Sequence, residues 1–112
     1  LSANPFSIAE LYQMSIAAYT SRLEIKPSTE VYVDRAIATY YSGDTASAIQ
    51  QLETYTTEDP YFAKAWANLG IFYATDGQTD KARESFEKGL EASPDSDTRA
   101  FIEESLESLE KN

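Results

Sequence analysis

The acidic side chains are the groups in this sequence that could do chemistry, because the usual catalytic alternatives are missing. The chain has no histidine and no cysteine, which removes the commonest general base and metal ligand, histidine-activated serine nucleophiles, thiolate metal sites and disulfides. Carboxylates do recur in pairs one helical turn apart, at Glu84 and Glu87 and at Glu103 and Glu107. Such pairs could bind a hard cation weakly, but no loop of alternating oxygen ligands accompanies them. We expect solvated helix faces, with no catalytic residue, no metal site and no cofactor.

The glycines do not form a phosphate-binding loop either. Gly43, Gly70, Gly77 and Gly89 are isolated from one another, whereas such loops need clustered glycines. We therefore expect a chain without enzyme activity.

Composition excludes several kinds of partner. The net charge of −10 and pI near 4.3 argue against binding along a nucleic-acid backbone or on an anionic membrane. No apolar run approaches the roughly 20 residues that span a bilayer, so we expect no direct membrane insertion. The 112 residues, 42% apolar and 25% charged, are typical of one soluble globular domain. The chain begins at Leu1 rather than methionine, so we expect a processed or partial product, and the compartment stays unknown.

The elements that organise the chain are best seen between residues 63 and 96. Trp66, Leu69, Gly70 and Tyr73 recur at helical spacing and form one apolar stripe with a glycine notch for a close neighbour. A facing stripe follows at residues 82 and 86, after an Asp-Gly break that suits a helix end. Two antiparallel helices are predicted.

This spacing carries a family resemblance. The pattern W-x2-L-G-x2-Y, followed by Ala82, Phe86 and Pro94, resembles a tetratricopeptide repeat, with Gly89 where that family usually has alanine. Gly43 and Gly77, Ala48 and Ala82, and Pro60 and Pro94 are each 34 residues apart, which is the period of this repeat. The preceding copy is weaker, because Tyr32, Arg35, Ala36 and Thr39 replace the four stripe residues; Tyr40 could supply the lost aromatic side chain.

The resemblance implies an all-α fold, an α-solenoid of antiparallel helix pairs with about six helices in a single domain over 1–112. Its parts would be an N-terminal helix or partial repeat (1–28), repeat 1 (29–62), repeat 2 (63–96) and a capping helix (97–112). Helices are expected near 6–25, 29–42, 45–57, 60–76, 79–92 and from residue 95 or 96 to 110. Asn4-Pro5 and Asp59-Pro60 are interpreted as a cap followed by proline at the first helical position, and Thr79 as an N-cap.

The resemblance also implies a function and a site. Members of the family bind other polypeptides in a concave groove lined by the first helix of each repeat. The corresponding positions here are Glu30, Val33, Asp34, Ile37, Tyr40 and Tyr41 in repeat 1, and Lys64, Ala67, Asn68, Ile71, Ala74 and Thr75 in repeat 2. One variety of this groove grips a C-terminal carboxylate with lysines, arginine and asparagines. Only Lys64 and Asn68 match that set of residues, and Glu30 and Asp34 would repel a carboxylate. We therefore predict a neutral or basic protein or peptide ligand.

An alternative stays open. The chain could serve as a self-association, assembly or spacer element of a larger protein, with its N-terminal helix or an uncovered groove pairing with another copy or with a neighbouring domain. A homo-oligomer that changes at Tyr12 or Ile16 block would support this alternative. The sequence also leaves open whether the N-terminal helix covers the groove or stacks as half a repeat. The segment 19–28 aligns with 86–95, which favours the half repeat.

Overall fold

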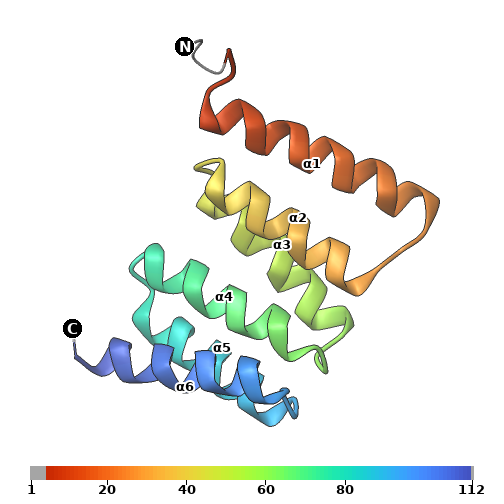
Figure 1. Ribbon diagram of the computed structural model, residues 1–112. Coiled ribbons are helices and arrows are strands. Elements are labelled where there is room, and N and C mark those ends of the chain that lie inside the picture. The colour runs from red at the N-terminus through yellow and green to blue at the C-terminus, as the bar shows by residue number, and fades with distance from the viewer. Residues whose placement is uncertain (1–4, 112) are drawn as a thin grey trace.

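The computed structural model describes residues 5–111, and every regular element in that range is an α-helix. The helices are α1 (Ile8–Ile25), α2 (Thr29–Tyr41), α3 (Thr45–Glu58), α4 (Ala63–Thr75), α5 (Thr79–Glu91) and α6 (Ser96–Glu110). Successive helices run antiparallel and stack from α1 at one end to α6 at the other (Figure 1). The all-α prediction is confirmed.

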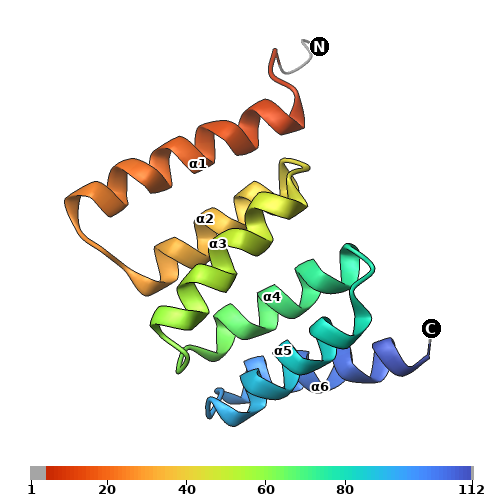
Figure 2. The same cartoon turned by 180° about the vertical axis from the view of Figure 1, so that it is seen from behind.

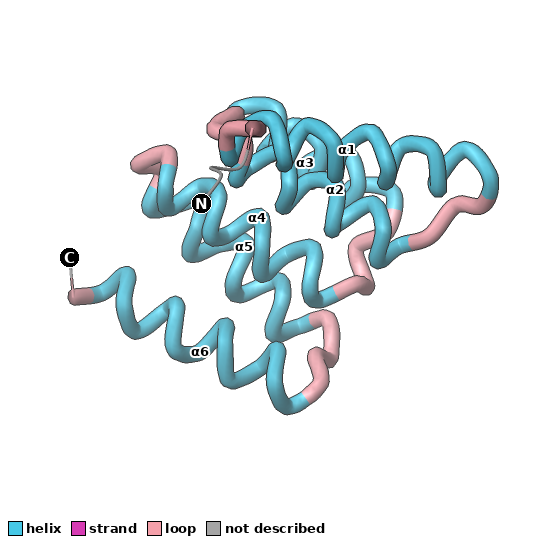
Figure 3. Tube along the Cα trace, turned by 45° about the horizontal axis from the view of Figure 1, so that its top comes forward, coloured by secondary structure: helices cyan, strands magenta, loops and turns pink. Residues whose placement is uncertain are grey.

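The stack has two rows of helices. An inner row consists of α2, α4 and α6, with α4 packed against both of the others. The helices α3 and α5 form the outer row and come forward when the molecule is turned round (Figure 2). Helix α1 packs on α2 alone, in the way that α3 packs on α4 and α5 on α6. It therefore stacks as half a repeat on α2 and does not lie over α4 (Figure 3).

Side-chain caps open four of the helices. Ser7 and Glu10 form a reciprocal capping box at the start of α1, while Ser28, Asp44 and Asp95 each accept a hydrogen bond from a backbone N–H in the first turn of α2, α3 and α6. The first cap differs from the sequence prediction: Asn4 lies outside the described residues, and Pro5 precedes the cap instead of opening the helix.

The start of α4 corrects a second prediction. The helix begins at Ala63, so Asp59 and Pro60 belong to the preceding turn. In that turn the Asp59 carboxylate accepts the backbone N–H of Tyr61, and the carbonyl of Pro60 accepts the indole N–H of Trp66 at 2.9 Å. Pro60 therefore belongs to the turn between α3 and α4, and Trp66 of α4 fixes this turn through its hydrogen bond to the Pro60 carbonyl. Thr79 likewise is the first residue of α5, and Gln78 is its N-cap.

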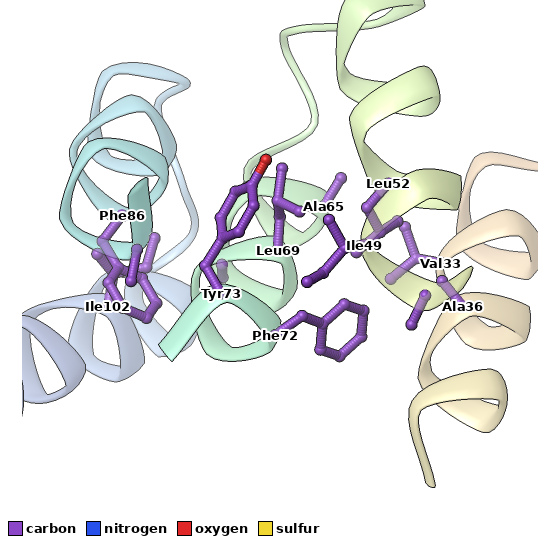
Figure 4. Close-up of a cluster of buried hydrophobic side chains, with 13 residues drawn as sticks. Val33, Ala36, Ile49, Leu52, Ala65, Leu69, Phe72, Tyr73, Phe86 and Ile102 are labelled. Atoms are coloured by element: carbon purple, nitrogen blue, oxygen red, sulfur yellow. The ribbon is translucent and has the colours of Figure 1, made fainter. Parts of the chain in front are cut away.

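The core runs from α2 to α6 between the two rows. Its largest fully buried side chains are Phe72, Phe86, Leu52, Leu69 and Ile102, contributed by α3, α4, α5 and α6 (Figure 4). Gly70 allows the closest approach, since a Cβ built there would lie 2.5 Å from the Phe86 ring. The glycine notch predicted from the stripe is thus filled by an aromatic ring of the partner helix.

Polar contacts replace the apolar stripe in the weaker repeat. The Arg35 guanidinium donates to Thr20 of α1 and lies 5.6 Å from the Tyr32 ring centroid. The Thr39 hydroxyl donates to the Arg35 carbonyl and accepts from Gln51 of α3. Tyr40 stacks on Phe72 with 4.6 Å between ring centroids, which confirms that it supplies the aromatic packing that Thr39 cannot.

Candidate functional site

The twelve predicted groove residues all lie on the inner helices α2 and α4, but they differ in accessibility. The exposed members are Glu30, Asp34, Tyr41, Lys64 and Thr75, and the half-buried members are Ile37, Tyr40, Asn68, Ile71 and Ala74. Val33 and Ala67 are 4% and 2% exposed, because they pack inside the stack. A ligand on this face would therefore meet the first two groups and not the third.

One end of the inner face forms a hollow of about 240 Å³. Glu30, Lys64 and Thr98 all line it, together with residues of the loops before α4 and α6. These three residues occupy the same place in α2, α4 and α6 and are 34 positions apart. The repeat thus gathers one acid, one base and one hydroxyl at this end of the row.

The charges around this hollow are partly engaged with one another. The Asp95 carboxylate caps α6, and the backbone N–H of Thr98, followed by the Thr98 hydroxyl, holds the pKa of Asp95 below its usual value. The Lys64 ammonium lowers the same pKa further. The Asn68 amide donates to the Lys64 carbonyl at 2.8 Å, within its own helix. Lys64 therefore lies near enough to Asp95 to affect its carboxylate, while the Asn68 amide is occupied within α4.

Aromatic side chains line the other end of the inner face, where α2 ends. The hydroxyls of Tyr40 and Thr75 lie 2.7 Å apart and join α2 to α4. Tyr41 is 57% exposed, and its ring contacts Tyr40 edge to face and stacks on Tyr12 of α1. This end is an apolar, ring-lined surface with two hydroxyls at its rim, which can pack against a ligand and accept or donate hydrogen bonds.

The groove predicted from the sequence did not include α6, the third helix of the inner row. Helix α6 packs against α4 as α4 packs against α2, so Phe101 and Ser105 continue the register of the groove residues. Phe101 is 43% exposed and therefore accessible on this face. The signal that could have found it was the 34-residue offset from Ala67 to Phe101 and from Ile71 to Ser105.

A second hollow, of about 410 Å³, lies away from the inner face between α2 and α3. Its lining includes Tyr32, Arg35 and Gln51, and it occurs where the weaker repeat lacks the large apolar residues of its successor. No group of three or more candidate metal ligands occurs within residues 5–111. In the same range no helix has the length and apolarity needed to cross a membrane.

Comparisons with known proteins agree with this architecture. Two fungal proteins are similar: the heat-shock protein cognate (HSC) co-chaperone sgt12 of Aspergillus fumigatus, 35% identical over 82 residues, and the small glutamine-rich tetratricopeptide repeat-containing protein 2 of Mycosarcoma maydis, 34% identical over 87. These alignments cover 72% and 77% of this chain but only 24% and 25% of the relatives. The chain thus spans about a quarter of their length.

A solved structure is also similar. The crystal structure of the Sgt2 TPR domain from Aspergillus fumigatus superposes with a TM-score of 0.78 at 31% identity, covering 91% of this chain and 68% of that one. The family profile described as tetratricopeptide repeat matches residues 40–101, more than half of the chain. Together with the paired helices and the 34-residue register, this places the chain in the tetratricopeptide repeat family.

Proposed function

We propose that the inner face of α2, α4 and α6 binds a segment of another polypeptide, without catalysis. The observation that carries this is the row of accessible side chains along three helices in one register, with Tyr41, Ile71 and Phe101 as apolar contacts and hydroxyls between them. A face of this kind suits an extended or helical peptide, because apolar contacts supply affinity and the polar groups fix orientation.

Charge favours a neutral or basic segment. Glu30 and Asp34 are exposed on α2, while the base on the same face, Lys64, already interacts with Asp95. The amide of Asn68 is engaged with its own helix. A terminal carboxylate would find one cation here, close to Asp95, and two acids that repel it.

The similar proteins suggest where such a segment could come from. One relative is named as a co-chaperone of a heat-shock protein cognate, so a polypeptide of a chaperone system is a reasonable first partner to try. We propose that such a partner would engage this chain through neutral or basic residues.

Peptide selection tests the proposed groove. Displayed random peptides would be selected on the wild-type protein and on two variants of equal helicity, Tyr41→Ala/Asn68→Ala in the groove and Gln50→Ala/Thr54→Ala on the exposed surface of α3. We expect enriched peptides that are neutral or basic, with affinity reduced about 10-fold or more in the groove variant, as for loss of an aromatic contact. The α3 variant should bind as the wild type does.

Two results would contradict the proposal. Enrichment of acidic peptides whose binding requires a free C-terminal carboxylate would overturn the charge preference. Selected peptides that bind the groove variant as tightly as the wild type would show that the inner face is not the working surface.

A further inference from the structure

Helix α1 is covered on one side only. It packs on α2 and on no other helix within residues 5–111, and Leu23 is its one buried residue. The equivalent helix of repeat 2 is different, since α5 packs between α4 and α6 and buries Ala82, Ser85 and Gly89. Aligning 19–28 with 86–95 places Ser15, Ala18 and Arg22 at those positions. Ala18 and Arg22 are exposed and Ser15 is half-buried.

The uncovered side of α1 is a regular seam. Its members are all exposed and alternate at spacings of three and four residues, as in a two-helix coiled coil: Leu11, Met14, Ala18, Ser21 and Ile25. The half-buried side chains of Tyr12 and Ile16 lie instead toward α2, where Tyr12 stacks on Tyr41. A helix face in water is normally polar, whereas this side of α1 exposes leucine, methionine and isoleucine.

We propose that this seam is a dimer interface, in which α1 of a second copy of this chain packs antiparallel against α1. The size pattern supports the antiparallel arrangement. When the two helices cross at residue 16, Leu11 faces Ser21 of the second copy and Met14 faces its Ala18. Leu11 and Met14 then each meet a small side chain, so the helices can approach closely, and the two-fold axis repeats both contacts.

Charge supports a second copy as the occupant. The chain carries a net charge of −10, so most ways of bringing two copies together place acid against acid. Residues 5–28 are an exception, because their two acids, Glu10 and Glu24, are balanced by two bases, Arg22 and Lys26. The seam is therefore the apolar side of an electrically neutral helix, where two acidic molecules can meet with little repulsion.

Sedimentation of the whole chain tests the interface. We expect the wild type to shift from monomer toward dimer mass as concentration rises, and Leu11→Glu/Ala18→Glu to stay monomeric with unchanged helicity. A matched control, Gln50→Glu/Thr54→Glu, adds the same two charges to exposed positions of α3 and should dimerise as the wild type does. A wild type that stays monomeric into the millimolar range would overturn the proposal, as would a dimer that the seam variant leaves intact.

Disulfide trapping tests the direction of the pair. The chain has no cysteine, so Met14→Cys and Ala18→Cys can be made singly and mixed. The antiparallel pair predicts a disulfide-linked dimer that is much more abundant in the mixture than in either variant alone. A Met14→Cys variant that crosslinks with itself as fast as the mixture does would indicate a parallel pair or random collision and would contradict the proposed register.

Discussion

At the scale of single residues, packing in this protein depends on a few close contacts between neighbouring helices. Tyr73 is 7% exposed, and its hydroxyl donates to the Glu53 carboxylate on α3. Burial, followed by that hydrogen bond and the charge of Glu53, raises the pKa of the Tyr73 phenol well above its usual value. A raised folded-state pKa means that the neutral phenol stabilises the fold, and that this contribution is lost as the pH rises.

Gly70 gives the sharpest prediction at this scale. Replacing Gly70 by alanine would put a methyl group 2.5 Å from the Phe86 ring, which is itself 1% exposed and cannot turn away. We expect Gly70→Ala to reduce the free energy of unfolding by about 1 to 3 kcal/mol, the usual cost of overpacking a core. Denaturant unfolding followed by circular dichroism measures this directly.

A compensating change separates overpacking from other causes. In the background Phe86→Leu the added methyl group finds more room, so Gly70→Ala should cost less there than in the wild type. Equal costs in the two backgrounds would rule out the contact with Phe86 as the cause.

At the scale of elements, the sequence predicted the helices well and their starting points less well. The predicted bounds of five of the six helices agree with the structure to within one or two residues. This is because apolar residues recur along the sequence with the period of a helix that is buried on one side. The start of α4 was wrong because Asp-Pro fits a turn as well as a helix start. In the structure the turn is held by hydrogen bonds from Tyr61 to Asp59 and from Trp66 to the Pro60 carbonyl, and the residue types alone do not predict these contacts.

The cap of α6 makes a prediction about pH. The pKa of Asp95 is lowered chiefly by the Thr98 backbone N–H, so the charged cap stabilises α6 above the unfolded-state pKa of about 3.9. That stabilisation is lost as the pH falls through the lower folded-state pKa. We expect the Thr98 amide shift to titrate with a midpoint below 3.9, the ordinary aspartate pKa, in an NMR pH series.

Asparagine at the same position is the control. Asp95→Asn keeps an oxygen acceptor for the cap without a titrating group, so the Thr98 amide should no longer follow this titration. The opposite result, a wild-type midpoint above the ordinary aspartate value, would contradict the capping role.

At the scale of the whole molecule, the position of each helix in the stack explains what the sequence could reveal about the site. On α4 the signature residues pack against both flanking outer helices: Gly70 lies against Phe86 of α5, and Tyr73 donates to Glu53 of α3. Helix α6 is followed by no outer helix in the described chain, and its corresponding positions hold Ala100, Glu103, Glu104 and Glu107, all exposed. The inner face therefore continues onto α6 without the signature that marks α4. The register also could not predict that Val33 and Ala67 are buried, because their burial depends on how closely the neighbouring helices pack.

Stability should also follow the order of the stack. Each helix contacts only its neighbours, so a defect at one end should loosen that end first. Ile102 is fully buried against Gly89, and we expect Ile102→Ala to cost about 2 to 5 kcal/mol. Hydrogen exchange should accelerate more in α5 and α6 than in α2 and α3. Uniform acceleration across the chain would show a single cooperative unit instead.

The same order of contacts has a consequence for synthesis. Every packed pair joins helices that are adjacent or next but one along the chain, so no segment must wait for a distant part before it can fold. Because such local topologies fold quickly, each helix pair can form on the ribosome soon after its second member leaves the exit tunnel. The inner face would then be assembled progressively, with α2 and α4 in place before α6 leaves the tunnel.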